Sequence, residues 1–420
     1  MMNNFLLKLR DIFLRRRTII LIGASILFWS AAIIYTLYMG QRLPYPDEQW
    51  YFNDYAQNLA RLHIYSRDGI SPTAFHPPGY PLFLGLIVSL GFGITMSRLL
   101  NFAAMYISLM CLYLLLEYRA YKIASLLAIL LALGYLVLFY TAGTLYPQTF
   151  GTLFFILAVM LFWKEPFTAR YAILAGASLG IAILTVPTFL FVPFFMVLFS
   201  IFFRKDRLQK LGLFLLLVFL VISIWTIRNY RAFNRFELIS SNFGINFLIG
   251  NNPATTPNNG PAAYTGITNI IATADQLGLD EFQRNKFYTQ QALGFIRQDP
   301  GHYLRLFLLK SANYFNFRNQ LLTASESSQA RDLVMLLSYG SLLLLAVLRL
   351  FYYRKYPLSR LETFLILLYI CNAFVSALAF TRIRYRLPFD YLLIAFVAIF
   401  LEKWLEDRSH AALPGRKLAE

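Results

Sequence analysis

Charged residues are scarce in this chain of 420 residues: Asp, Glu, Lys and Arg make up 14% of it, whereas 58% of the residues are apolar. A soluble domain carries about 25% charged and about 45–50% apolar residues, so the composition argues against an ordinary soluble enzyme. The apolar residues also form long runs. Residues 18–39 and 123–142 hold no charged residue over roughly 20 positions, the length that an α-helix needs to cross a bilayer. The sequence therefore predicts an all-α polytopic membrane protein.

Cysteine and histidine are also rare, with two and four residues respectively. Cys111 and Cys371 both lie within apolar runs, so neither a disulfide framework nor a Cys-type metal site is available. The chain has no phosphate-cradling glycine loop of the Walker or Rossmann type, no paired-His metal motif and no Gly-x-Ser-x-Gly. ATP-driven chemistry and zinc chemistry are therefore not indicated.

The basic residues are spread along the chain and do not gather in one patch. The chain has 38 Lys and Arg against 21 Asp and Glu, a formal net charge of +17. A nucleic-acid-binding protein would carry such a charge as a stripe interleaved with exposed aromatic residues. Here the basic residues punctuate the apolar runs, as expected if they hold short loops on the cytoplasmic side of a membrane. Membrane lipids, and not nucleic acid, are the expected surroundings.

About ten apolar runs are predicted to span the membrane. They cover roughly residues 18–39, 97–116, 123–141, 147–163, 171–186, 188–203, 211–227, 333–351, 361–380 and 387–402. Two shorter runs, residues 78–92 and 303–317, are placed in the outer interface, because 21 of the 38 basic residues then lie on the cytoplasmic side. The sequence thus predicts a multi-pass protein of the cytoplasmic (inner) membrane with both termini in the cytoplasm.

This topology divides the chain into three parts. Residues 1–227 form a transmembrane module with a first external loop at 40–97, residues 228–332 form an external region, and residues 333–420 form the last helices and a cytoplasmic tail. Two interfacial helices are expected in the first external loop, and residues 275–297 are expected to form one external amphipathic helix on the membrane face. The external segments hold nearly all the candidate chemistry, so the active face is expected to be extracytoplasmic.

The first candidate site is the pair Asp47-Glu48, directly after the first span. Adjacent carboxylates at a membrane edge are costly to desolvate and usually mark a site or a metal. Pro46 interrupts the helix before them, so Asp47 is predicted to cap an amphipathic helix over residues 48–62. One face of that helix would carry Tyr51, Tyr55, Leu59 and Leu62. The alternative is that Asp47 only caps the helix and Glu48 only favours its dipole.

A rigid corner follows in the same loop, with the sequence Phe-His-Pro-Pro-Gly-Tyr-Pro at residues 75–81. Its prolines and glycine fix the backbone, which aims the loop back over the membrane. His76 and Tyr80 are candidate residues of a site here. The alternative for His76 is a structural or solvated role.

A third candidate joins Arg228-Asn229-Tyr230, at the outer end of the seventh span, to an Asn- and Gly-rich stretch that contains Asn251. Together they make a polar loop close to the bilayer, which suits a head group with many hydroxyls. The alternatives are that Arg228 is a snorkelling anchor and that the Asn/Gly stretch only makes turns.

The fourth candidate is Arg382, Arg384 and Arg386 with Tyr385 between them, on the outer side before the last span. Three guanidinium groups on the side that disfavours basic residues require an anionic partner, and Arg recognises phosphate in a bidentate manner. The three side chains share a face in a strand and spread in a helix, so the number that reach one phosphate stays open. The alternative is anchoring to lipid head groups.

These motifs occur in a characteristic order: an Asp-Glu pair after the first span, an amphipathic helix, Pro-Pro-Gly-Tyr-Pro, Arg-Asn-Tyr, Gly-Asn-Asn-Pro and Arg-Tyr-Arg-Leu-Pro. The series resembles bacterial membrane glycosyltransferases of the GT-C superfamily, family 39 type, similar to protein O-mannosyltransferases and lipid A aminoarabinose transferases. The resemblance runs from about residue 10 to residue 403.

The resemblance implies a polyprenyl-phosphate-linked sugar as donor and a glycan, lipid or protein as acceptor, on the outer face of the membrane. Asp47 would be the general base or a carboxylate that orients the acceptor, with Glu48 beside it, and an inverting transfer needs a carboxylate to take the acceptor proton. The implied phosphate-binding residues are Arg384, Arg386 and Arg228. The residues expected to line the substrates are Tyr51, His76, Tyr80, Asn229, Asn251 and Tyr385.

One position departs from the family pattern. Relatives often carry a second acid in the short external turn before the fourth span, where this chain has Gln148. An amide cannot act as a base or a strong cation ligand, which disfavours a divalent cation that bridges two carboxylates. No metal or other cofactor is assigned. Two other functions stay open: a lipid-linked-sugar flippase or other transporter, and a non-catalytic envelope scaffold, the latter favoured if Asp47 and Arg384 lie more than about 15 Å apart.

Overall fold

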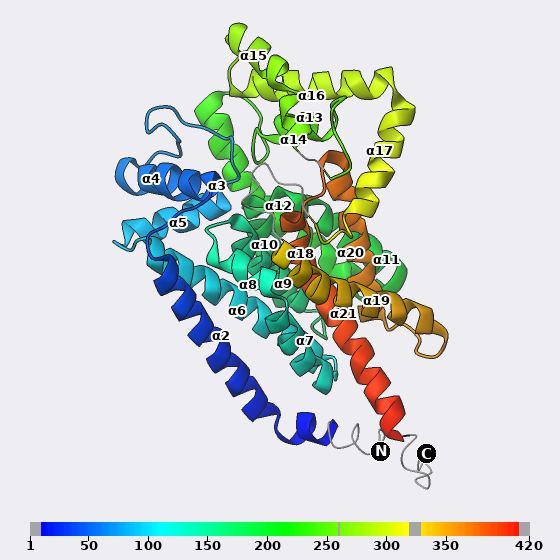
Figure 1. Ribbon diagram of the computed structural model, residues 1–420. Coiled ribbons are helices and arrows are strands. Elements are labelled where there is room, and N and C mark those ends of the chain that lie inside the picture. Colours follow the sequence, from blue (N-terminus) through cyan, green and yellow to red (C-terminus); the bar gives the residue numbers. More distant parts are fainter. Residues whose placement is uncertain (1–9, 259–260, 319–328, 411–420) are drawn as a thin grey trace.

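A computed structural model describes residues 10–258, 261–318 and 329–410 (Figure 1). Every regular element in these ranges is helical, which confirms the all-α prediction. The long apolar helices form one body, and a smaller group of helices lies across one end of it (Figure 1). The body comprises α2 (Arg17–Met39), α6 (Ile94–Tyr118), α7 (Lys122–Gly134), α8 (Leu136–Gly143), α9 (Pro147–Phe162), α10 (Ala169–Thr185), α11 (Val192–Phe203), α12 (Leu208–Phe233), α18 (Gln329–Met335), α19 (Ser341–Phe351), α20 (Arg360–Ala379) and α21 (Ile383–His410).

Several of these helices can cross a bilayer. In the described chain, five helical segments are long and apolar enough: Arg17–Met39, Ile94–Tyr118, Lys205–Phe233, Gln329–Arg354 and Arg360–Ala379. A sixth is present if α7 and α8, which are bent by 66° at Tyr135, count as one span. The protein is thus a polytopic membrane protein, as predicted, while the number of ten spans stays a prediction.

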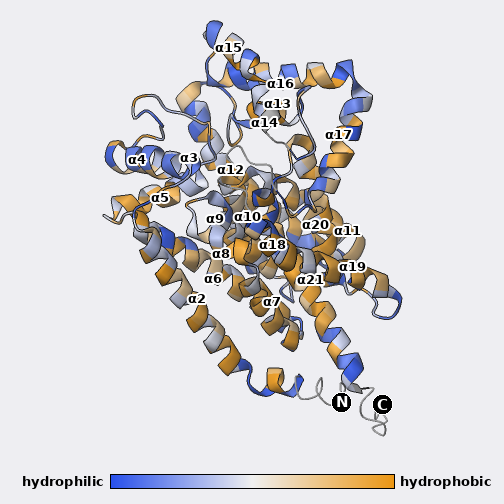
Figure 2. Ribbon diagram, viewed as in Figure 1, coloured by the Kyte–Doolittle hydropathy of each residue, from blue (hydrophilic) through white to orange (hydrophobic). Residues whose placement is uncertain are grey.

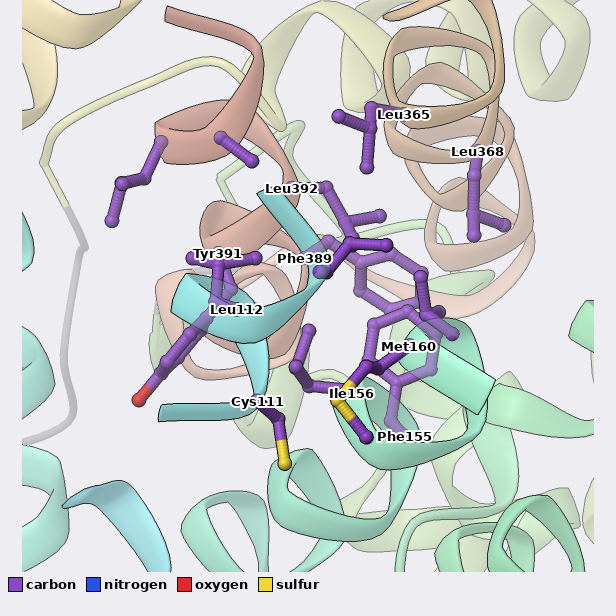
Figure 3. Packing of buried hydrophobic residues seen from close by; sticks show 14 of the residues in the cluster. Cys111, Leu112, Phe155, Ile156, Met160, Leu365, Leu368, Phe389, Tyr391 and Leu392 are labelled. Carbon is purple, nitrogen blue, oxygen red and sulfur yellow. The ribbon is translucent and has the colours of Figure 1, made fainter. Parts of the chain in front are cut away.

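The core lies where helices from distant parts of the chain meet. Figure 3 shows Leu112 of α6, Phe155 of α9, Leu368 of α20 and Phe389 of α21 packed together, and each is fully buried or nearly so. Helix α2 behaves differently, because it exposes large apolar side chains such as Leu37, which is 71% exposed. An apolar surface on a helix of this length is the expected face toward lipid, and Figure 2 shows it along α2.

The first external loop forms the outer layer on one side. A continuous helical segment runs through α3 (Pro46–Gln49), the π-helical η1 (Trp50–Ala56) and α4 (Gln57–Leu62), close to the predicted residues 48–62. The prediction that Asp47 caps this segment is wrong, because Pro46 occupies the first helical position, where its missing N–H costs nothing, and Tyr45 is the cap. On the predicted apolar face, Tyr51 and Tyr55 are buried, whereas Leu62 is exposed.

Helix α5 (Gly79–Ser89) packs beneath this segment, against η1 and α4. Gly79 explains why the proline-rich corner needs glycine, since a Cβ atom there would lie 3.0 Å from Thr185 Cα at the end of α10. Helix α5 is thus a short helix that packs between the loop and the body, and the non-crossing course of residues 78–92 stays a prediction.

The second part of the outer layer comprises α13 (Phe243–Gly250), α14 (Pro261–Thr265), α15 (Thr268–Gln276), α16 (Glu281–Gln298) and α17 (Pro300–Asn313). The prediction of one helix over residues 275–297 is wrong. The chain turns at Gly278, whose φ is +62°, and Asp280 starts α16 by accepting hydrogen bonds from Phe282 N and Gln283 N. Helix α17 descends from α16 and packs against α20 (Figure 1); its predicted place in the membrane interface stays a prediction.

Candidate active site

The structure brings Asp47 and Arg384 together. Arg384 Nη1 donates to Asp47 Oδ2 at 2.7 Å, and the two side chains remain 31% and 30% exposed. Asp47 lies in the first turn of α3, where the helix dipole favours an anion. Arg384 lies in the first turn of α21, where the dipole disfavours a cation. Arg384 is thus a partly exposed cation at a helix start, which keeps it a candidate anion-binding residue.

Tyrosines surround this ion pair. The Arg384 guanidinium lies 6.0 Å from the ring centre of Tyr146 and 5.1 Å from that of Tyr385. Its Nη2 donates to the Tyr385 hydroxyl at 3.1 Å, while its Nε is buried without a partner. Tyr51, one helical turn after Asp47, is 8% exposed, and burial and the Asp47 carboxylate raise the pKa of its hydroxyl well above the usual value. Arg384 therefore keeps unused hydrogen-bonding capacity in an aromatic setting of low polarity.

His76 and Tyr80 form a second layer behind Tyr51. The ring centres of His76 and Tyr80 lie 5.3 Å and 5.6 Å from that of Tyr51. His76 Nδ1 is hydrogen-bonded to the Tyr55 hydroxyl at 3.0 Å, and burial lowers the pKa of His76 to about 4. The Tyr80 hydroxyl accepts a hydrogen bond from Asn101 Nδ2 at 2.9 Å. The proline-rich corner thus supports the helix that carries Asp47. The His76 imidazole is neutral at neutral pH because of its low pKa.

Glu48 faces away from the ion pair. Its side chain is fully buried, and its two oxygens accept hydrogen bonds from Leu145 N at 2.8 Å and Tyr45 N at 3.1 Å. Burial raises the pKa of Glu48, and these two backbone donors counteract the rise. Glu48 therefore ties the first external loop to the turn before α9, and Asp47 is the acid that faces Arg384.

Within the described chain, no hydrogen bond joins Asp47 to Arg228, Asn229 or Asn251. Arg228 Nη1 donates to Thr73 O at 2.9 Å, and its guanidinium lies over the Trp225 ring at 4.7 Å. Asn229 Nδ2 donates to the backbone of residue 237 at 3.0 Å. Asn251 donates to the backbone of residue 378 at 2.8 Å and accepts from the Lys310 ammonium at 3.2 Å. These groups hold the external segments on the helix ends.

The three arginines before the last span diverge because α21 already begins at Ile383. Arg382 Nη2 donates to the Tyr264 hydroxyl at 2.7 Å, in the outer layer. Arg386 is 1% exposed and pairs with Asp390 at 3.2 Å inside the helical body. Arg386 Nη1 also donates to the backbone of residues 314 and 316 at 2.8 and 2.6 Å. Arg384 alone of the three is joined to Asp47, and Arg386 is already fully engaged.

Asp390 is a residue that sequence reasoning missed. It is fully buried and accepts hydrogen bonds from the Tyr135 hydroxyl at 2.8 Å and the Tyr369 hydroxyl at 3.1 Å. It therefore joins the bend between α7 and α8 to α20 and α21. The signal was an acid inside an apolar run, four residues after an arginine, a spacing that pairs two side chains on a helix.

The residues present do not suit a divalent cation. Within the described ranges there is no group of three or more His, Cys, Asp or Glu side chains able to hold a metal. Asp47 is paired with a guanidinium, and Glu48 is taken up by two backbone amides. Gln148 is buried and its Oε1 has no partner, but one neutral amide oxygen is a weak ligand next to an arginine.

Comparison with known proteins gives a family match over part of the chain. A family model described as dolichyl-phosphate-mannose-protein mannosyltransferase matches residues 75–227. The predicted resemblance is confirmed on this stretch. The matched stretch begins at the residue before His76 and ends at the residue before Arg228.

Among curated proteins there is no significant match. Among solved structures, the chain is similar to the crystal structure of ArnT from Cupriavidus metallidurans bound to undecaprenyl phosphate, with 13% identity, a TM-score of 0.44, and coverage of 90% of this chain and 78% of that chain. The apo structure of the same ArnT matches with 12% identity, a TM-score of 0.41, and coverage of 91% and 77%.

Proposed function

We propose that the protein is an integral membrane glycosyltransferase that moves a sugar from a polyprenyl-phosphate carrier to an acceptor hydroxyl. The observation that carries this proposal is the contact between Asp47 and Arg384, which puts a carboxylate and a phosphate-binding cation within one hydrogen bond of each other. The description of the matching family model names a dolichyl-phosphate-linked sugar, which supports a polyprenyl phosphate as the carrier.

In this mechanism the two residues act on opposite ends of the reacting centre. The acceptor hydroxyl attacks the anomeric carbon, and its proton passes to the Asp47 carboxylate. The bond from that carbon to the phosphate oxygen breaks, and the polyprenyl phosphate leaves with the bonding electrons. Arg384 stabilises the charge on that phosphate. Because Glu48 is engaged by backbone amides, it is not free to form a glycosyl-enzyme as a second carboxylate beside Asp47, and we therefore assign a transfer that inverts the configuration at the anomeric carbon.

The ion pair also suggests the order of events. Without donor, Arg384 is held by Asp47 and by the Tyr385 hydroxyl. A donor phosphate competes for the guanidinium, since it offers bidentate acceptors. Binding of the donor would therefore release the Asp47 carboxylate for the acceptor proton. Polyprenyl phosphate-sugar is accordingly proposed to bind before the acceptor.

We place this reaction on the extracytoplasmic face of the inner membrane, with both chain termini in the cytoplasm, on the strength of the positive-inside distribution. A non-catalytic scaffold would be favoured if Asp47 and Arg384 lay more than about 15 Å apart. The two side chains are instead in contact. A transport pathway would need accessible charges within the helical body. The Arg386–Asp390 pair there is buried, and tyrosine hydroxyls and backbone carbonyls enclose it.

A direct assay tests the proposal. Purified protein in detergent is incubated with polyprenyl-phosphate-linked sugars and a membrane extract as acceptor source, and released polyprenyl phosphate is measured. We expect release that depends on the purified protein. Absence of both release and donor binding, with a folded protein and every donor tried, would overturn the proposal.

A further inference from the structure

A cavity of about 240 Å³ lies in the outer layer, between the first external loop and helices α13 and α16. Phe75 of the loop, Ile245 of α13 and Tyr288 of α16 provide its apolar and aromatic walls. The following residue of the loop is His76, whose ring contacts Tyr51 beside the reactive pair. The cavity therefore adjoins the candidate active site through two consecutive residues.

The cavity walls are fixed by hydrogen bonds. Glu281, at the start of α16, accepts from Ala74 N at 3.0 Å, from Thr73 Oγ1 at 2.5 Å and from the Ser241 hydroxyl. These bonds tie the loop, the approach to α13 and α16 into one unit. Because these walls are already fixed, binding of a ligand costs less conformational entropy than binding to a mobile surface.

Close packing fixes the opposite wall. Gly244 N donates to Asn285 Oδ1 at 2.6 Å, and a Cβ atom at Gly244 would collide with the Asn285 carbonyl. Helices α13 and α16 thus touch through their backbones beside the cavity.

The lining chemistry selects a neutral ligand that carries hydroxyls. An anion is disfavoured by the Glu281 carboxylate, and the Arg284 guanidinium already pairs with Asp275 and donates to Leu279 O at 2.8 Å. A cation is disfavoured because the Glu281 oxygens already accept from Thr73 Oγ1, Ala74 N and the Ser241 hydroxyl. A purely apolar ligand would cover the Asn285 side-chain NH₂ without offering it an acceptor, because among the described residues only the Oδ1 of this amide is engaged, by Gly244 N.

A sugar ring fits both walls, because its C–H faces pack on aromatic side chains while its hydroxyls meet amide and guanidinium groups. The volume is below the roughly 300–1,000 Å³ of sites for drug-sized ligands, so it suits a single ring.

We propose that this cavity is an acceptor subsite that holds one neutral sugar ring, so that the acceptor is a glycan or the glycan part of a glycolipid. This inference rests on the proposed glycosyltransferase function. Phe75 in the cavity and His76 behind Tyr51 would then connect acceptor binding to the position of the reacting groups.

Saturation-transfer NMR on the detergent-purified full chain tests the subsite. The probes are the methyl glycosides of glucose, mannose, galactose and N-acetylglucosamine. Ile245→Trp fills the cavity, and Leu277→Trp, at a position that is 60% exposed and does not line the cavity, is the matched control. We expect at least one glycoside to bind with a Kd of about 1–10 mM, Ile245→Trp to weaken it at least about tenfold, and Leu277→Trp to leave it unchanged.

Two results would overturn the subsite: no glycoside binds, or binding survives in a folded Ile245→Trp variant. If Ile245→Trp does not fold, Phe75→Leu, which removes one aromatic wall of the cavity, must weaken binding at least about threefold. The subsite and the proposed function fail separately. Glycoside binding without any release of polyprenyl phosphate or donor binding contradicts the function alone, whereas release of polyprenyl phosphate without any glycoside binding contradicts the subsite alone.

Discussion

Arg384 and Asp47 lie 337 positions apart in the chain, yet Arg384 Nη1 donates to Asp47 Oδ2 at 2.7 Å. Asp47 lies in the first turn of the helical segment after the first span, and Arg384 lies in the first turn of α21. The pair therefore forms only when the two ends of the described chain are folded together. Both side chains keep about a third of their surface exposed, so each remains accessible to a substrate.

Replacement of Glu48 should reduce stability. In Glu48→Gln an amide NH₂ would face one of the backbone donors at Leu145 and Tyr45, which leaves a buried donor without an acceptor. We expect the free energy of unfolding to fall by about 1–3 kcal/mol, measured by denaturing-detergent titration in mixed micelles. Asp47→Asn breaks only a partly exposed ion pair and should cost about 0–1 kcal/mol. A stable Glu48→Gln variant without transfer activity would instead give Glu48 a part in the chemistry.

Replacement of Arg384 should weaken donor binding. Arg384→Gln removes the charge that is proposed to hold the donor phosphate, and a hydrogen bond to a charged group contributes about 1.5–3 kcal/mol. The KM for the polyprenyl-phosphate sugar should rise about 10- to 100-fold. Arg231→Gln, at an exposed arginine on the outer end of α12, is the control and should leave this KM unchanged. Equal KM values for the two variants would remove Arg384 from phosphate binding.

Stability should depend on pH through His76. Burial lowers its pKa to about 4 in the folded protein, against about 6.5 in the unfolded chain. Between these values the unfolded state binds more protons, so stability falls as the pH decreases from about 6.5 to about 4, by about 3 kcal/mol for this group. His76→Gln should flatten this part of the stability curve in unfolding titrations at several pH values. An unchanged slope would show that His76 is accessible and charged there.

The buried pair in α21 should be a stability determinant. Asp390→Asn leaves Arg386, which is 1% exposed, without its counter-charge, and loss of one partner of a buried pair costs about 3–5 kcal/mol. Arg235→Gln breaks a pair with Asp280 in which both side chains are about half exposed, and should cost about 0–1 kcal/mol. The two variants are compared by denaturing-detergent titration. Similar small losses in both would mean that the α21 pair is solvated.

Much of the fold could be predicted from the sequence, because apolar runs and basic loops respond directly to the bilayer. The contact between Asp47 and one of the arginines before the last span was also within reach. The choice among Arg382, Arg384 and Arg386 was not, because it depends on where α21 begins: at Ile383 the helical spacing sends each side chain to a different partner.

Other features depended on contacts between distant residues. The sequence places Glu48 beside Asp47 as a second acid, and only the structure shows that its carboxylate accepts from Leu145 N. The break between α15 and α16 was signalled by Gly278 and Asp280, but the amphipathic pattern continues across it. The role of Arg228 likewise depends on Thr73 O, far away in the chain.

The most direct test of the central claim is the rate of sugar transfer from a polyprenyl-phosphate donor by the Asp47→Asn variant. The account predicts a folded protein that binds the donor and transfers no sugar, a loss of at least about 100-fold, because the acceptor proton has no base. Turnover at the wild-type rate in the same preparation would contradict it.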